Sequence, residues 1–204
     1  MDKRQAEELI RRNRLLEAEV ERLRVYKEYA YTDVLTEIPN RRFYYERLTQ
    51  EVARARRSHY ALSLALMDLD RFKDVNERMG HRGGDQVLKF FAQFLKANIR
   101  REDVACRVGG DEFAVLLPDT SVDNAATLVE RIRRKLDRIE LSIEGFPRLQ
   151  LSFSCGLAGF QDGLLAEDVL EEADHSLFSA KARGRNRVVT ARSGTFAAVP
   201  ELVQ

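Results

Sequence analysis

The first 31 residues form a charged segment in which apolar positions repeat every seven residues. Leu9, Leu16 and Leu23 follow this spacing, and the segment contains neither Pro nor Gly. Asn13 lies four residues after Leu9, at the second core position of the repeat. This heptad pattern predicts a parallel two-stranded coiled coil in which paired asparagines fix the register. A single amphipathic helix lying on the rest of the protein is the alternative interpretation.

Beyond residue 31 the pattern alternates between helical and extended segments. Helical spacing of apolar residues predicts helices at 41–58, 85–100, 123–139 and 167–183. Asn40 is suited to cap the first of these helices, and Gly83 with Gly84 precedes the second. Apolar runs predict strands at 60–67, 104–108, 113–117, 149–158 and 187–191. The alternation predicts an α+β fold in which helices surround one sheet.

Composition limits the classes of partner. The 34 basic and 33 acidic residues leave a net charge of +1, so no strong overall field favours a nucleic acid polymer or a membrane surface. Cys106 and Cys155 lie far apart in apolar context, which predicts buried free thiols in a reducing cytoplasm. Met1 is followed by charged residues, and no apolar stretch approaches 18 residues. We therefore expect neither a signal peptide nor a membrane span, and a cytoplasmic location.

Carboxylates collect at two points of the predicted sheet. Asp68 ends the buried run at 60–67, and Asp111 with Glu112 follows the paired glycines of the sequence RVGGDEF. Glycines turn tightly and let a ligand approach the backbone, while neighbouring carboxylates suit divalent cations. Such a turn alone is more often an ordinary hairpin. The second acidic strand end beside it favours a metal-dependent phosphoryl-transfer site.

Five motifs follow one another in the order of a known family. They are DVLTEIPNRR, DLDRFKDVN, GHRGGD, RVGGDEF and KARGRNRV, and they lie between residues 33 and 189. With these motifs the chain resembles the GGDEF-domain diguanylate cyclases. The resemblance implies a five-stranded sheet of the nucleotide-cyclase and polymerase-palm type at 32–192, after the coiled-coil helix at 1–31. The remaining residues, 193–204, are expected to form a flexible tail.

The resemblance also implies a reaction and a metal site. Two GTP molecules would be joined into cyclic di-GMP with release of two pyrophosphates. Asp68, the backbone carbonyl of Leu69, Asp111 and Glu112 would hold Mg²⁺ or Mn²⁺, two ions per active site. Asp111 is the best candidate for accepting the 3′-hydroxyl proton, and activation of that hydroxyl by the metal is an equally good description. Glu112 would be a further metal or catalytic carboxylate. Lys73 would stabilise charge that develops on the phosphates.

Further residues are implied to bind the nucleotide. Asp85 with Asn76 would read guanine, because a carboxylate accepts from both the N1–H and the amino group of guanine and adenine offers no such pair. The other implied GTP contacts are Phe72, Lys73, Gly109, Gly110, Lys181 and Arg185. The simpler roles are helix N-cap for Asp85, turn residue for Asn76, and a solvated basic turn for Lys181 and Arg185.

One more pair matches a family motif. Arg100 and Asp103 have the RxxD spacing, a few residues before Gly109, at which the family binds its inhibitory product. Arginine can fork onto guanine or phosphate, and aspartate can accept from the guanine amino group. The simpler interpretation is a cation near a helix C-terminus followed by an ordinary turn residue.

These expectations combine into one function and two alternatives. Each domain would hold one GTP, and a product with two linkages needs two facing sites, so we expect a homodimer paired through both the coiled coil and the catalytic domains. Cyclic di-GMP would act as product and inhibitor. The alternatives are a degenerate domain that binds GTP or cyclic di-GMP as a receptor, and a coiled-coil assembly module without chemistry.

Overall fold

The structure is a computed structural model that describes residues 3–191, and the predicted tail at 193–204 lies outside the described residues. Its helices are α1 (Lys3–Tyr31), α2 (Arg41–Ser58), α3 (Phe72–Lys96), α4 (Val122–Leu136) and α5 (Ala166–Ala182). Its strands are β1 (Leu62–Leu69), β2 (Val104–Arg107), β3 (Glu112–Pro118), β4 (Glu140–Leu141), β5 (Leu149–Gln150), β6 (Phe153–Gly159) and β7 (Val188–Thr190).

The described residues contain a five-stranded sheet in the order β2-β3-β1-β6-β7, as predicted. β7 pairs with β6 in parallel, and the other neighbours are antiparallel. β1 is the central strand and is buried along nearly its whole length, which explains its almost unbroken apolar sequence. Its last residues lie beside the start of β3, with Asp68 directly opposite Glu112.

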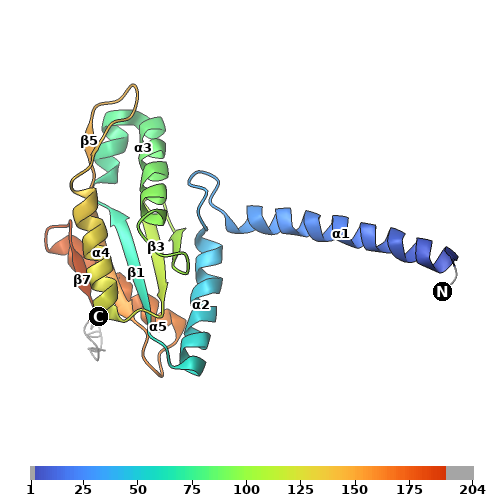
Figure 1. Cartoon of the computed structure of the whole chain (residues 1–204). Helices are drawn as coiled ribbons and strands as arrows, with labels where there is room; N and C mark the ends of the chain where they lie inside the picture. The colour runs from blue at the N-terminus through green and yellow to red at the C-terminus, as the bar shows by residue number, and fades with distance from the viewer. Residues whose placement is uncertain (1–2, 192–204) are drawn as a thin grey trace, which may run out of the picture.

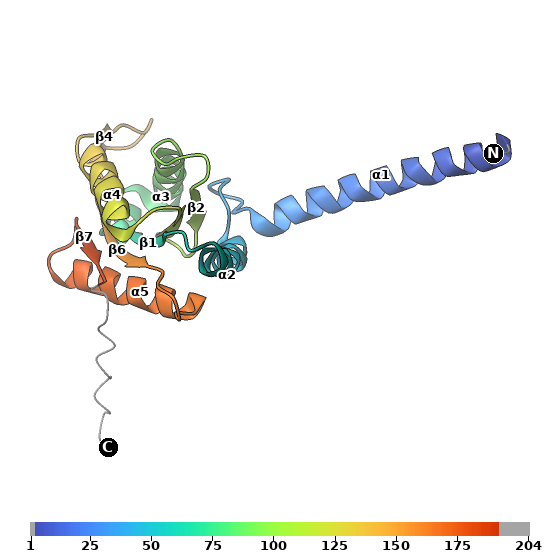
Figure 2. The ribbon, with the colours of Figure 1, turned by 60° about the horizontal axis from the view of Figure 1, so that its bottom comes forward.

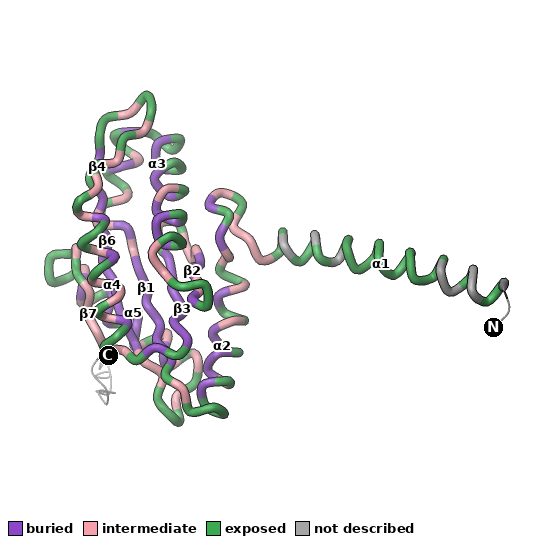
Figure 3. The backbone as a smooth tube through the Cα atoms, viewed as in Figure 1, coloured by how far each residue is buried: buried purple, intermediate pink, exposed green. Residues whose placement is uncertain are grey.

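Helices cover both faces of this sheet. Figure 2 shows α3 and α4 on one face and α2 and α5 on the other. Successive residues of β1 alternate between the two layers: Met67 packs in the cluster that includes α3 and α4, while Leu66 packs in the cluster that includes α2 and α5. Burial is concentrated in the strands and the inward faces of these helices (Figure 3).

The prediction for the second helix is wrong in its boundary. α3 begins at Phe72, so Gly83 and Gly84 lie inside a helix and Asp85 is no N-cap. The break in the helix comes earlier, at Gly80, whose φ of 66° and ψ of 174° are not helical. Gly83 is needed for close packing within the helix rather than for a turn, since a Cβ there would lie 2.4 Å from Cβ of Met79.

The predicted strand at 149–158 is two strands in two sheets. β5 pairs with β4 in a two-stranded sheet of its own, whereas β6 joins the main sheet. β4 was absent from the sequence prediction. The other predicted helices and strands are confirmed to within a few residues, and the Asn40 side chain accepts a hydrogen bond from Phe43 N at 3.1 Å. Cys106 and Cys155 are free and buried, and burial raises the pKa of the Cys106 thiol to about 12.

α1 is a helix, as predicted, and it projects away from the sheet (Figure 1). The side chains of Leu9 and Leu23 lie outside the described part, but Leu16 and Val20 are more than half exposed, at 54% and 56%. This arrangement disfavours a helix lying on the domain, and pairing with a second copy stays a prediction. Among the described residues, no helix has the length and apolar character needed to cross a membrane.

The junction between α1 and α2 is short and hydrogen-bonded. Asn40 donates its backbone N–H to Tyr31 O at 2.9 Å and its side-chain amide to Ala30 O at 3.0 Å. Thr32 and Pro39 form a β-bridge within the same segment. These contacts fasten the last turn of α1 to the first turn of α2.

Candidate active site

The paired glycines lie in the turn between β2 and β3. Glu112 O accepts hydrogen bonds from Val108 N at 3.0 Å and Gly109 N at 3.3 Å, which closes the turn. A Cβ on Gly109 would lie 2.4 Å from Glu112 Oε2, so the Glu112 carboxylate occupies the space beside this glycine. Gly110 has no atom within 4 Å of such a position and is open to an approaching group.

Three carboxylates lie close to one another at this end of the sheet. Because Asp68 and Glu112 are opposite residues of neighbouring antiparallel strands, their side chains leave the same face. Asp111 is tied to the end of β1 through its carbonyl, which accepts from Leu69 N at 3.2 Å. Burial raises the pKa of Asp68, and the negative charges of Asp111 and Glu112 raise it further.

Lys181 opposes this charge. Its Nζ lies 2.7 Å from Asp68 Oδ2 and lowers the pKa of that carboxyl, although burial and the other carboxylates outweigh it. Lys181 comes from the last turn of α5, 113 residues along the chain from Asp68. From the sequence, Lys181 was expected to meet phosphate and Asp68 to hold metal, and the structure places the two side chains in contact.

The donor set suits a divalent cation. Within residues 3–191 no group of three or more His, Cys, Asp or Glu side chains is already arranged to hold a metal ion. However, the ionised Asp68 carboxylate is disfavoured by burial and by two acidic neighbours, a state that a bound cation would relieve. Carboxylate and carbonyl oxygens are the ligands that Mg²⁺ and Mn²⁺ prefer. The residues present therefore fit the predicted metal.

The predicted guanine residues lie on α3, on either side of its break. A Cβ on Gly84 would lie 2.0 Å from Asn76 Oδ1 and 3.2 Å from the ring of Phe72. Phe72, Asn76 and Gly84 are thus in contact, and Asp85 follows Gly84 in the chain. Their meeting depends on the bend at Gly80, because Asn76 and Gly84 belong to different arms of the helix.

Two predicted phosphate residues are exposed. The Lys73 side chain is 88% exposed and lies 3.7 Å from Glu77, so the structure does not bring it to the carboxylates. Arg185 lies in the loop after α5 and lines a pocket of about 490 Å³ together with Asp70 and Arg71. The backbone of Arg185 is left-handed, with φ at 62°.

Arg107 and Asp33 form a contact that the sequence analysis missed. Arg107 donates to Gly109 O at 3.1 Å and to Gly110 O at 2.8 Å, and its third contact is Asp33 Oδ1 at 3.0 Å. Thr36 also donates to Asp33 Oδ1, from its backbone at 2.9 Å and from its hydroxyl at 2.7 Å. Burial would raise the pKa of Asp33, but the hydrogen bonds from Thr36 and Arg107 lower it overall. Arg107 and Asp33 each lie in one of the five sequence motifs, and this was the signal that could have identified them.

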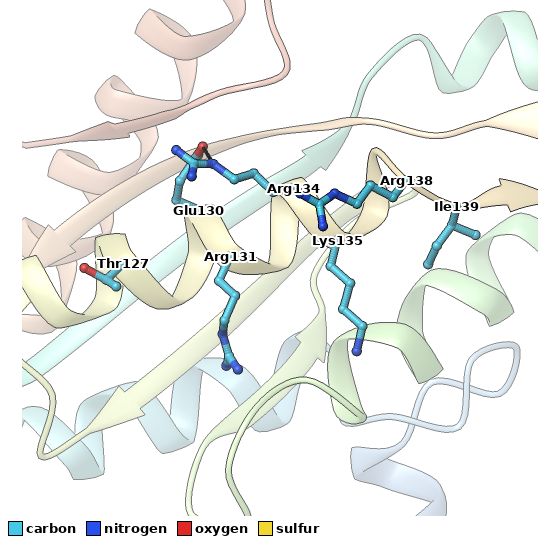
Figure 4. Close-up of a pocket in the computed structure, with 7 residues that line it drawn as sticks. All are labelled: Thr127, Glu130, Arg131, Arg134, Lys135, Arg138 and Ile139. Carbon is cyan, nitrogen blue, oxygen red and sulfur yellow. Dashed lines mark hydrogen bonds and ion pairs between the residues drawn. The ribbon is translucent and has the colours of Figure 1, made fainter.

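Asp103 is buried beside Arg100. Its Oδ2 accepts from Arg100 N at 2.8 Å, which supports the simpler turn role, while its buried Oδ1 has no partner among the described residues. Burial raises the pKa of this carboxyl. Both residues line a hollow of about 810 Å³ that Arg131 and Lys135 of α4 also line. Figure 4 shows Arg131 and Lys135 among the basic residues of the adjoining hollow, which is about 780 Å³.

Comparison with known proteins gives consistent matches. Residues 30–187 match the family model described as "Diguanylate cyclase, GGDEF domain". The chain is 42% identical over 165 residues to the diguanylate cyclase DgcP of Pseudomonas aeruginosa, covering 81% of this chain and 24% of the relative. It is 38% identical over 156 residues to the diguanylate cyclase DosC of Escherichia coli, covering 76% of this chain and 34% of the relative. The chain thus spans only about a quarter to a third of these curated relatives.

Solved structures give the same match at the level of the fold. The coiled coil and GGDEF domain of DgcB from Caulobacter crescentus, in complex with c-di-GMP, align with a TM-score of 0.81 at 33% identity. The alignment covers 90% of this chain and 99% of that one. The diguanylate cyclase SiaD of Pseudomonas aeruginosa, in complex with its activator SiaC, aligns with a TM-score of 0.78 at 33% identity. That alignment covers 92% of this chain and 72% of SiaD.

Proposed function

The chain belongs to the diguanylate cyclase GGDEF domain family, and from this premise we propose that it condenses two GTP molecules into cyclic di-GMP with release of two pyrophosphates. The observation that carries the proposal is the pairing of Asp68 with Glu112 across neighbouring strands, beside the glycine turn. A receptor that had lost catalysis would have no need to keep carboxylates crowded at a buried strand end, where ionisation is disfavoured.

The metal site is part of this proposal. Asp68, the Leu69 carbonyl, Asp111 and Glu112 would hold Mg²⁺ or Mn²⁺, two ions per site, which would neutralise the triphosphate and favour ionisation of the 3′-hydroxyl. Asp111 would accept the proton of that hydroxyl. The open space beside Gly110 leaves room for phosphate oxygens next to the turn.

The remaining site residues would position GTP. Asp85 and Asn76 would accept from and donate to the guanine edge, with Phe72 packed against Gly84 behind them. Lys181, Arg185 and Lys73 would meet the triphosphate. Alignment of a hydroxyl with the pyrophosphate leaving group is the main demand of this reaction, so binding residues on rigid elements contribute directly to rate.

The product requires two sites. One GTP per domain and two 3′–5′ linkages mean that two domains must face each other. The exposed apolar residues of α1, among them Leu16 and Val20, supply a surface for pairing with a second copy. The solved structure of DgcB, which comprises a coiled coil and a GGDEF domain, supports the same arrangement for this chain.

Incubating the purified chain with GTP and Mg²⁺, followed by identification of the nucleotide product, tests the function. We expect cyclic di-GMP from the natural sequence and none from Asp111→Asn, which should remain folded. GTP binding without any dinucleotide product would favour the receptor alternative. Equal production by Asp111→Asn would reject the site assignment.

Product inhibition is tested separately. We propose that cyclic di-GMP binds in the hollow beside Arg100 and Asp103, where Asp103 Oδ1 lacks a partner among the described residues and Arg131 and Lys135 add positive charge. Progress curves should flatten as product accumulates. Arg100→Ala should remove this curvature without lowering the initial rate, and unchanged curvature would return the pair to its turn role.

A further inference from the structure

Asp70 has no role in the proposed chemistry, although it lies two residues after Asp68. Its carboxylate accepts three hydrogen bonds in the structure. Ser152 Oγ donates to Oδ2 at 2.8 Å, and Ser154 Oγ donates to Oδ1 at 2.7 Å. The backbone N–H of Asn186 donates to Oδ2 at 3.0 Å. Both oxygens are therefore already engaged by β6, its flank and the loop after α5.

The loop that Asp70 holds has an unusual backbone. Arg185 and Asn186 are consecutive residues with positive φ, 62° and 45°. Non-glycine residues adopt this conformation only when the surrounding contacts fix it. Asn tolerates it better than Arg, because its short side chain can bond locally. The strain at Arg185 thus needs an external anchor.

The bonds of Arg185 itself are local: its N–H donates to Ala180 O at 3.1 Å, and its carbonyl accepts from Arg187 Nε at 3.0 Å. The contacts of this pair of residues with the rest of the domain attach to Asn186. In addition to the bond from its N–H to Asp70, Asn186 Nδ2 donates to Asp137 Oδ1 at 3.1 Å. Arg133 Nη1 donates to Asn186 Oδ1 at 2.9 Å and to Asp137 Oδ2 at 2.7 Å. The residue next to Arg185 is therefore held by Asp70, just after β1, on one side and by the C-terminal end of α4 on the other.

The Arg185 side chain itself has no such contacts. Within the described residues its guanidinium has no hydrogen bond or ion pair, and it is exposed beside the 490 Å³ pocket that Asp70 also lines. A fixed backbone with a free guanidinium is the arrangement expected of a residue that presents its charge to an anionic ligand.

We propose that Asp70 is a positioning residue for the nucleotide: it fixes the backbone at Asn186 so that Arg185 reaches the β- and γ-phosphates of GTP. This inference rests on the proposed function, since it takes GTP as the ligand. Asp70 is not a metal ligand in this scheme, because its oxygens accept from two serines and a backbone amide. Its effect on GTP is exerted through Arg185 alone.

The test compares a triphosphate with a monophosphate. The ligands are GMP and the α,β-methylene analogue of GTP, which the reaction does not cleave, titrated into the full chain with Mg²⁺ by calorimetry. Asp70→Asn should weaken binding of the analogue about tenfold, because a charged acceptor of three hydrogen bonds is lost. Binding of GMP should change less than about twofold, since GMP lacks the phosphates that Arg185 contacts.

Matched variants test whether Asp70 affects nucleotide binding through Arg185. Arg185→Ala should produce the same selective loss, and Asp70→Asn added to Arg185→Ala should cause no further loss. Asp85→Ala serves as the contrast and should weaken both ligands equally. An equal loss of both ligands in Asp70→Asn, unchanged affinities, or additive losses in the double variant would each overturn the proposal.

Folding and metal binding are controlled in the same series. If Asp70→Asn fails to fold, Ser152→Ala and Ser154→Ala remove one donor each while keeping the carboxylate, and each should give a smaller loss confined to the analogue. Mg²⁺ should stabilise Asp70→Asn against heat as much as the natural chain. Loss of that stabilisation would make Asp70 a metal ligand and overturn the proposal, whereas failure of the natural chain to bind the analogue would reject the proposed function instead.

Discussion

Asp68 carries a cost in stability that its proposed role in metal binding would explain. Its side chain is only 13% exposed, and its pKa is raised by burial and by Asp111 and Glu112. Lys181 offsets part of this cost. A carboxylate held in an unfavourable environment of this kind is typical of functional sites, which agrees with the role proposed for Asp68.

Replacing Asp68 by Asn should therefore abolish cyclic di-GMP synthesis while raising the thermal midpoint at pH 7 in the absence of divalent ions. The direction of this change in thermal midpoint follows from the pKa of Asp68. Because the folded chain raises the pKa of Asp68 above its ordinary value of 3.8, ionising this carboxyl costs folding free energy at every pH above the raised value. Below about pH 3.8 the cost disappears, since the carboxyl is protonated in both states.

Thermal denaturation of both proteins between pH 7 and pH 3 measures this effect. The two midpoints should converge as the pH falls. A lower midpoint for Asp68→Asn at pH 7 would mean that the lost contact with Lys181 outweighs the relief of burial, contrary to this prediction.

At the scale of elements, β6 and α5 meet at a glycine. A Cβ on Gly156 would lie 2.0 Å from Ala173 O and 2.2 Å from Leu177 N, both of them backbone atoms of α5. Gly156→Ala should destabilise the fold by about 3 kcal/mol or more, because neither element can move away without disturbing the core. Urea unfolding measures the loss.

Gly110→Ala is the control for this substitution. No atom lies within 4 Å of a Cβ at that position, so its free energy of unfolding should stay within about 0.5 kcal/mol of the natural value. Equal stability of the two variants would show that α5 can shift away from β6.

The contact between Arg107 and Asp33 connects the glycine turn to the segment before α2. Their side chains are 14% and 25% exposed, and the guanidinium bonds to the carbonyls of both glycines of the turn. Arg107→Lys should lower kcat by about tenfold or more, because an ammonium cannot span the carbonyls and the carboxylate together.

Hydrogen exchange at Val108 and Gly109, whose amides donate to Glu112 O, provides a second readout. Exchange at these amides should accelerate in Arg107→Lys. It should stay unchanged in the control Arg101→Lys, because Arg101 is exposed in the turn before β2. Unaltered exchange in Arg107→Lys would show that the turn is rigid without this contact.

The sequence predicted most elements because their signals are local. The apolar run of β1 and the cap at Asn40 depend on neighbouring residues only. The prediction for Gly83 and Gly84 was wrong because paired glycines suggest a turn, whereas here they make room for Met79 and Asn76 within a helix. Each strand of the β4–β5 pair has two residues, too few for a periodic signal.

In the site, too, residues within motifs could be predicted, whereas contacts between residues far apart in the chain could not. The motifs led to the proposed roles of Asp68, Asp111, Asn76 and Asp85, and the structure brings Asp68 to Glu112. The bond between Lys181 and Asp68 joins residues 113 apart, and the contact of Arg107 with Asp33 joins residues 74 apart. Such pairs depend on the order of the strands, which no local pattern contains.

For the whole molecule, the proposed reaction would need two copies to meet, and we expect α1 to bring them together. Deleting residues 1–28 should leave a folded domain that binds GTP, because Asp68, Asp111 and Asp85 lie within one chain. Its activity per chain should fall and increase steeply with protein concentration, since only transient encounters would bring two sites together.

Activity per chain measured against concentration, for the full chain and the truncated form, tests this expectation. The full chain should be nearly independent of concentration. If both proteins behave alike, association resides in the catalytic domains and α1 is not needed for pairing.

The fastened junction at Asn40 has a rotational consequence. The last turn of α1 is bonded to the first turn of α2. The rotation of α1 about its own axis therefore sets the direction in which the domain faces. Each residue of an α-helix adds about 100° of rotation, so seven inserted residues restore the original phase to within about 20° and two inserted residues reverse it. Insertion of seven residues after position 24 should keep synthesis of cyclic di-GMP, and insertion of two should suppress it without preventing association. Equal activity of the two insertion variants would mean that the domain rotates freely relative to α1 at this junction.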